Sequence, residues 1–127
     1  HAIYAITGGE EVSRDQLTIS HFEPWVKFAK ENGFGIDFNP TCFSHPLSSD
    51  GLTLSHPNED IRRFWINHCK ASRKIALEMG KALGEPCVNN LWIPDGYKDT
   101  AVDTYGARQR LLASLNEIYE EKMPSEV

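Results

Sequence analysis

The sequence lacks long apolar runs and any excess of positive charge. A membrane-spanning helix needs roughly 18 to 20 consecutive apolar residues, and no stretch of the chain approaches that length. The 13 Lys and Arg residues are outnumbered by 18 Asp and Glu residues, which gives a formal net charge of -5. The basic residues are also scattered along the chain. Nucleic acids and anionic membranes are therefore poor candidates for partners.

Paired cysteine motifs and the common catalytic signatures are also missing. Three widely spaced cysteines without a CxxC pair predict neither a disulfide framework nor a zinc knuckle, and they fit a reducing cytoplasm best. No GxGxxG, GxxxxGK[ST] or GxSxG sequence occurs, and no two histidines have the HExxH spacing. The sequence therefore gives no support for a nucleotide-binding protein or a serine hydrolase.

The patterns that are present indicate alternating strands and helices in one domain. Short apolar runs predict strands at residues 2–7, 34–39 and 86–93, and amphipathic periodicity predicts helices at residues 20–33, 58–83 and 104–122. This order favours parallel pairing, in an open doubly wound sheet or in part of a closed (β/α) barrel. The chain starts without Met at full strand character, which suggests a cut within or just before a strand.

Both architectures bind ligands at the carboxyl ends of their strands. That rule selects the stretch from Asn39 to His45 after the second strand, and Trp92, Asp95 and Lys98 after the third. An aromatic residue at such a place can be core filler, or it can stack on the C–H face of a sugar. Phe43 and Trp92 are open to both interpretations.

The other histidines and the cysteines have simpler explanations. His21 and His68 lie on predicted helices, where packing or capping is the usual role. His45 and His56 each precede a proline and are expected mainly to shape a loop. Cys42 and Cys87 have no helix N-terminus or neighbouring base to activate them, so they are expected to be inert buried thiols.

Several long motifs resemble bacterial L-rhamnose isomerases. They are DFNPTCFSHPLSSDGLTLSH at residues 37–56, IRRFWINHCKASR at 61–73, WIPDG at 92–96 and ARQRLLA at 107–113, with HAIY and VSRDQ near the start. The resemblance covers essentially the whole chain, although members of that family are considerably longer. It therefore implies an internal fragment of such an enzyme.

The resemblance implies a fold and an activity. The family fold is a TIM (β/α)8 barrel, of which residues 1–127 would be a partial domain of about three β/α units, truncated at both ends. The family interconverts L-rhamnose and L-rhamnulose with divalent ions, typically Mn²⁺, as a cytoplasmic homotetramer. Because the metal-binding residues lie on later strands, the fragment is expected to contain none of the main ligands and to be inactive alone.

The resemblance also assigns three site residues, one motif at a time. His1 resembles the histidine that assists ring opening, Phe43 the aromatic of a Phe-Ser/Thr-His-Pro loop, and Trp92 the tryptophan that walls the sugar pocket. Two alternatives stay open. One is a non-catalytic sugar-binding or assembly module that uses the same aromatics, and the other is a related isomerase that acts on another aldose.

Overall fold

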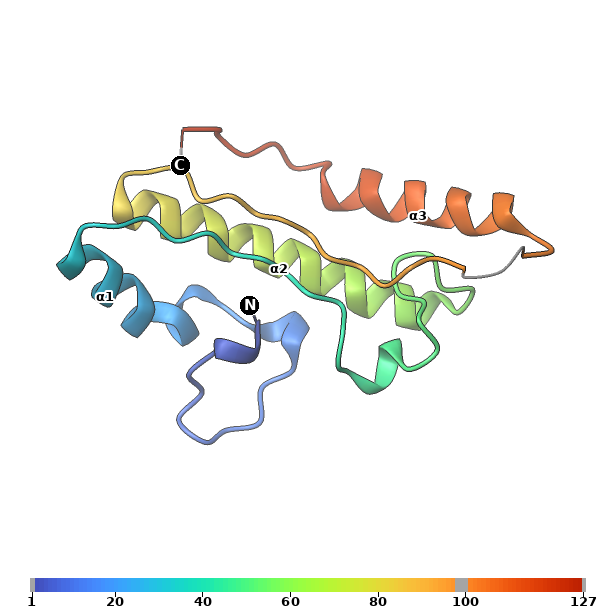
Figure 1. The fold of residues 1–127 in the computed structure, drawn as a ribbon, viewed down its shortest axis with the longest axis horizontal. Coiled ribbons are helices and arrows are strands. Elements are labelled where there is room, and N and C mark those ends of the chain that lie inside the picture. Colours follow the sequence, from blue (N-terminus) through green and yellow to red (C-terminus); the bar gives the residue numbers. More distant parts are fainter. Residues whose placement is uncertain (1, 98–100, 127) are drawn as a thin grey trace.

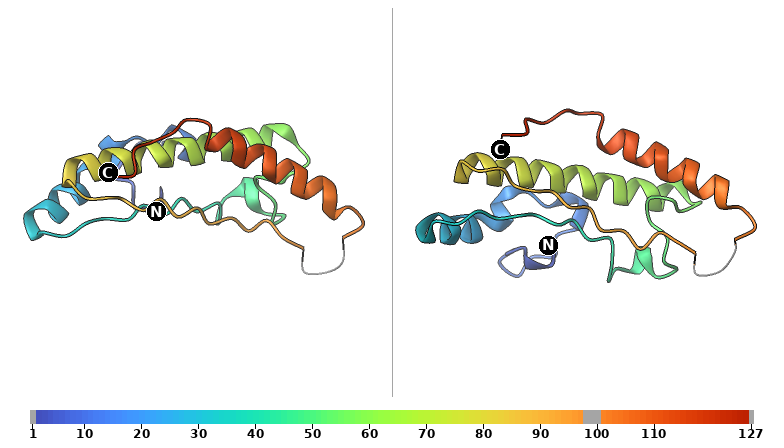
Figure 2. Two further views of the ribbon diagram at one scale, coloured as in Figure 1. Left: turned by 90° about the horizontal axis from the view of Figure 1, so that it is seen from above. Right: turned by 45° about the horizontal axis from the view of Figure 1, so that its top comes forward.

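The computed structural model describes residues 2–97 and 101–126, and its centre is one long helix (Figure 1). This helix is α2 (Glu59–Leu83), flanked by α1 (Glu23–Asn32) and α3 (Thr104–Ile118). Four short 3-10 turns complete the regular elements: η1 (Ala2–Tyr4), η2 (Arg14–Gln16), η3 (Ile19–Phe22) and η4 (Pro46–Ser48). Two extended segments run along one side of α2 and α3 (Figure 2).

The predicted helices are confirmed, with small shifts at their ends. Asn58 caps α2 by accepting hydrogen bonds from the N–H groups of Asp60 and Ile61, and Gly84 ends the helix at a φ of 72°. Gly33 ends α1 in the same left-handed conformation. A capping box of Thr18 and His21 begins η3, the turn that leads into α1. Helix α3 ends at Ile118, one turn earlier than expected.

The apolar face of α2 divides the core into two clusters. Near its C-terminus, Ile75 and Met79 pack against Phe22 of η3 and Phe38 of the first extended segment. Near its N-terminus, Trp65 and Ile66 belong to a second cluster, with Cys42, Leu54, Cys69 and Ile118. Because both clusters take residues from segments far apart in sequence, burial of α2 holds the molecule together.

Helix α3 is fastened to α2 and to the loop before it by polar contacts. The Ser114 hydroxyl donates to the Leu54 carbonyl at 2.7 Å, and Arg110 Nε donates to the Ser55 carbonyl at the same distance. The Glu117 carboxylate pairs with Arg63 and Lys70 of α2. These contacts fix the loop at residues 49–58 beneath α3.

The second and third predicted strands are extended and parallel but do not form strands. The segments pair only at two isolated bridges, Phe38 with Asn89 and Thr41 with Trp92. Between the bridges lies Pro40, which has no N–H to donate to the ladder. The Asn89 side chain, at 3.3 Å, donates to the Phe38 carbonyl. The prediction of strands at residues 34–39 and 86–93 was thus wrong, although the parallel direction was right.

The first predicted strand was also wrong. Residues 2–4 form the turn η1, and residues 5–7 are irregular. A parallel strand needs a neighbour, and in the part of the chain that the structure describes the Ile6 N–H bonds instead to the His21 carbonyl at 2.8 Å. The fragment as described is therefore mostly helical and shows no complete β/α unit. No helix of the described residues is long and apolar enough to cross a membrane.

Candidate functional site

The two extended segments have one covered face and one open face. Alternate residues turn toward α2 and are buried or packed on its clusters: Phe38, Pro40 and Cys42 in one segment, and Cys87, Leu91 and Ile93 in the other. The intervening residues Val88, Asn90 and Trp92 are exposed. This period of two is that of a half-buried strand pair. The segments therefore present side chains on a face that nothing in the described structure covers.

Phe43 and Trp92 both lie toward the carboxyl ends of their extended segments, at or just after the bridge between Thr41 and Trp92. The Trp92 N–H donates to the Pro40 carbonyl, and the Cys42 N–H donates to the Trp92 carbonyl, each at 2.9 Å. Trp92 thus pairs beside Thr41, and Phe43 follows two residues later on the same face. The Phe43 and Trp92 side chains are 38% and 50% exposed, respectively. Because the family resemblance implies a considerably longer protein, this exposure leaves both interpretations of the two aromatics open.

Asp95 holds the end of the second segment in place. Its carboxylate accepts hydrogen bonds from the N–H and the hydroxyl of Thr53, and from the N–H and the hydroxyl of Ser55, at 2.8 Å for each N–H. Both partners are buried. Asp95 was a candidate ligand-binding residue because it follows the predicted strand at residues 86–93. Its role in the structure is to tie the Trp92 segment to the loop at residues 49–58.

His45 shapes the loop that carries Phe43. Its Nδ1 accepts from the Leu47 N–H at 3.1 Å, and its ring stacks on Phe64 with centroids 4.8 Å apart. Burial lowers the pKa of His45, and the Arg14 charge adds to this effect. These contacts support the expectation that His45 shapes the loop.

His56 and His68 are held in structural contacts. His56 Nε2 lies 2.8 Å from an Asp50 carboxylate oxygen, and its Nδ1 accepts from the Asn58 N–H. His68 is fully buried on α2, with Nδ1 3.2 Å from the Arg14 carbonyl oxygen. Both arrangements agree with the expected structural roles.

The cysteines have the properties of inert thiols. Burial raises the pKa of Cys87 to about 11. The Cys69 thiol, hydrogen-bonded to Cys42 and buried, also has a raised pKa. Because the thiolate is the reactive form, a raised pKa disfavours nucleophilic chemistry. All three cysteines are free.

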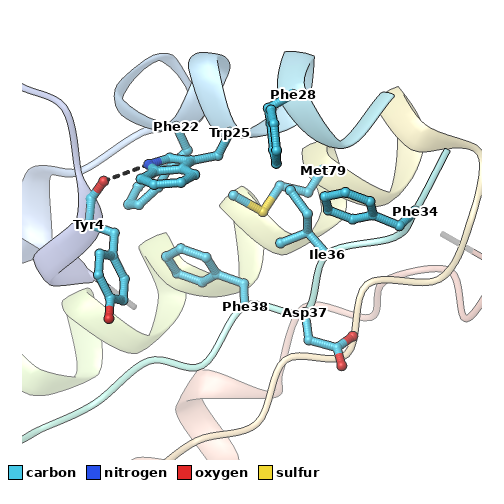
Figure 3. A pocket seen from close by; sticks show the side chains of 9 residues that line it. All are labelled: Tyr4, Phe22, Trp25, Phe28, Phe34, Ile36, Asp37, Phe38 and Met79. Atoms are coloured by element: carbon cyan, nitrogen blue, oxygen red, sulfur yellow. Dashed lines mark hydrogen bonds between the residues drawn. The ribbon is translucent and has the colours of Figure 1, made fainter. Parts of the chain in front are cut away.

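A second candidate is an aromatic pocket at the other end of the first extended segment (Figure 3). It measures about 360 Å³ and is lined by Tyr4, Phe22, Trp25, Phe28, Phe34, Ile36, Asp37, Phe38 and Met79. Asp37 points away from the rings, and one of its oxygens accepts from the Val88 N–H at 3.0 Å. A sugar site needs convergent polar groups. This pocket therefore suits an apolar packing partner better than a sugar.

Comparison with known proteins decides the family. The family model described as L-rhamnose isomerase (RhaA) matches residues 1–127. The chain belongs to the L-rhamnose isomerase family. It is 58% identical over 123 residues to the L-rhamnose isomerases of Shigella flexneri serotype 5b and Escherichia coli O127:H6, and 57% identical to that of Escherichia coli O157:H7. Each alignment covers 97% of this chain and 29% of the relative.

The described part of this L-rhamnose isomerase chain does not fit a metal centre by itself. Across residues 2–97 and 101–126, no three or more His, Cys, Asp or Glu side chains are grouped so that they could hold an ion. Asp95, which follows Trp92 closely in the sequence, already accepts hydrogen bonds from Thr53 and Ser55. The described residues therefore do not make up a complete metal site by themselves.

Two sequence-predicted residues lie outside the described part of the L-rhamnose isomerase chain, namely His1 and Lys98. The structure pairs Trp92 with Thr41, two residues before Phe43. Sequence reasoning missed Arg14, whose guanidinium contacts the backbone beside Phe43. Nothing in the local pattern could have indicated this, because the contact joins positions 29 residues apart.

Proposed function

We propose that this chain is part of an enzyme that interconverts L-rhamnose and L-rhamnulose, and that it supplies an aromatic wall of the sugar site. The observation that carries the proposal is the bridge between Trp92 and Thr41, two residues before the exposed Phe43, within a chain 58% identical to L-rhamnose isomerases. The relatives are named for that activity, and the chain spans 29% of their length.

The chemistry of the two aromatic residues suits this task. Aromatic rings offer apolar faces to the C–H groups of a sugar and leave its hydroxyls to polar neighbours. Two rings on adjacent segments would also exclude water from the reacting carbons. The engaged side chains around them, Asp95 and His45, would act by fixing the wall rather than by transferring protons.

The proposal includes a divalent cation, Mn²⁺, in the longer protein. Its ligands would then come at least partly from beyond the described residues, among which no three His, Cys, Asp or Glu side chains are grouped to hold an ion. When bound, such an ion acts as a Lewis acid on the sugar oxygens. His1 would assist ring opening at the same site, as the family resemblance implies.

The proposal also places the chain in a (β/α)8 barrel of a cytoplasmic homotetramer. Two parallel extended segments joined through α2 support the barrel, because they have the connectivity of a βαβ unit. Their open face would then turn toward the barrel interior, where the sugar binds at the carboxyl ends of the strands. In a closed barrel, each of the two extended segments would also bond to a further strand along its free edge.

The wall is tested in the longer protein that contains this chain. Trp92→Ala and Phe43→Ala should each raise KM for L-rhamnose by about tenfold or more, since burying an aromatic side chain contributes about 1.5 to 3 kcal/mol. Tyr105→Ala is a matched control, because Tyr105 is an exposed aromatic on α3. Unchanged KM in both wall variants would overturn the assignment. Sugar binding without turnover in the unaltered protein would favour a non-catalytic binding module instead.

A further inference from the structure

Arg14 joins the 3-10 turn η2 to the backbone on either side of Phe43. Its Nη1 donates to the Phe43 carbonyl at 2.7 Å and approaches the Thr41 carbonyl at 3.4 Å, while Nη2 donates to the Ser44 carbonyl at 2.9 Å. One planar guanidinium therefore contacts three carbonyls within four residues. A lysine could not reproduce this geometry, because its ammonium is a single point charge.

The backbone that Arg14 contacts is strained. Ser44 has a φ of 53° and is the one non-glycine residue with positive φ in the described structure. Such a conformation persists only where surrounding contacts enforce it. Because the Phe43 and Ser44 carbonyls flank this turn, the Arg14 bonds stabilise the conformation that directs Phe43.

Arg14 is itself held in position from the helix side. Its carbonyl oxygen lies 3.2 Å from Nδ1 of His68, and since a carbonyl can only accept, Nδ1 carries the proton. His68 is fully buried on α2 and packs edge-on against Trp65 at 5.6 Å. The Phe43 turn is thus connected to the core through Arg14 and His68.

We propose that Arg14 is a positioning residue for the sugar site, which sets the place of the Phe43 ring through the carbonyls of residues 41, 43 and 44. This inference rests on the proposed function. Arg14 contacts the backbone and acts on sugar binding only through Phe43. Loss of the guanidinium fork lets Ser44 relax and moves Phe43 from the wall.

The test is a double-mutant cycle on KM in the longer protein that contains this chain. Arg14→Lys keeps the charge but loses the fork, and should raise KM for L-rhamnose by about tenfold with a smaller change in kcat. In a Phe43→Ala background the same substitution should change KM less than about twofold, because the residue it positions is gone. Equal effects in the two backgrounds, or no change in KM, would overturn the proposal.

Arg73→Lys is the matched control. Arg73 also holds carbonyls with its guanidinium, those of Ile118 and Glu121, but it does so at the junction of α2 and α3. It should lower thermal stability without changing KM. If Arg14→Lys fails to fold, Arg14→Gln replaces it. Failure of both to fold would contradict a positioning role. An unaltered protein without rhamnose isomerase activity would instead refute the proposed function.

Discussion

Individual carboxylate and imidazole side chains hold the loops around the open face in place through hydrogen bonds. Asp95 is the strongest example, since both of its oxygens accept from buried partners. We predict that Asp95→Asn destabilises the longer protein by about 2 kcal/mol, because the N–H groups of Thr53 and Ser55 would bond to a neutral amide oxygen instead of a carboxylate. Chemical unfolding measures the change.

Asp103→Asn is the control for that measurement. Asp103 caps α3 through one bond from the Gly106 N–H, and asparagine caps helices about as well as aspartate. Its free energy of unfolding should stay within about 0.5 kcal/mol of the unaltered protein. An equal loss of unfolding free energy in the two variants would show that the Asp95 hydrogen bonds stabilise the protein no more than an ordinary helix cap does.

His68 predicts a pH dependence of stability. Burial is the main cause that lowers the pKa of His68, and the positive charge of Arg14 lowers it further. Hydrogen bonds to the Arg14 and Thr41 backbone and the negative charge of Asp15 partly oppose this shift. Because the folded pKa lies below the unfolded value, the unfolded chain binds the proton more readily. Stability should therefore be full above pH about 6.5 and fall as the pH drops below it.

His68→Asn isolates this contribution. Asparagine retains an N–H donor near the position of Nδ1 but does not titrate. The unfolding free energy of the variant should decline less steeply between pH 7 and 5 than that of the unaltered protein. The lowered pKa of His45 acts in both proteins alike and cancels in the comparison. Parallel pH profiles would contradict the account.

At the scale of elements, the sequence predicted helices well because their signals are local. Apolar periodicity together with Asn58 and Gly84 located α2 almost to the residue. We predict that Asn58→Ala destabilises the protein by about 1 kcal/mol, since two N–H groups lose their acceptor. Asn58→Asp should cost almost nothing. Thermal unfolding of the two variants compares them, and equal melting temperatures would contradict the capping role.

The strands could not be predicted in the same way because pairing depends on distant neighbours. Residues 34–39 have strand composition, but Pro40 interrupts the ladder that would have extended them. Residues 2–7 form no strand, and the Ile6 N–H bonds to the His21 carbonyl of η3 instead. The alternation of buried and exposed positions survives in both paired segments, and Phe43 and Trp92 are among the exposed residues. Their role in a sugar site stays a prediction.

At the scale of the whole molecule, the exposed apolar surface predicts association of the 127-residue chain. The open face exposes Val88 and Trp92, and the aromatic pocket exposes Trp25, Phe28 and Phe34. Such patches and unpaired edges favour contact between copies. Sedimentation of the isolated chain should show oligomers or aggregates. A single monomeric species would contradict this prediction.

Family membership could be inferred from the sequence because the motifs at residues 37–56 and 61–73 are long. No metal site could be predicted from local spacing, because no two histidines have the HExxH spacing and no CxxC pair occurs. Likewise the role of Arg14 depends on contacts between segments that only the folded chain brings together.

The most direct test measures conversion of L-rhamnose to L-rhamnulose with added Mn²⁺, by the longer protein and by the 127-residue chain in parallel. The longer protein should convert L-rhamnose, should lose this activity after chelation and should recover it when Mn²⁺ is restored. The 127-residue chain should show no conversion. A longer protein inactive under these conditions, or turnover by the 127-residue chain alone, would contradict the central claim that this chain is a non-autonomous part of an L-rhamnose isomerase.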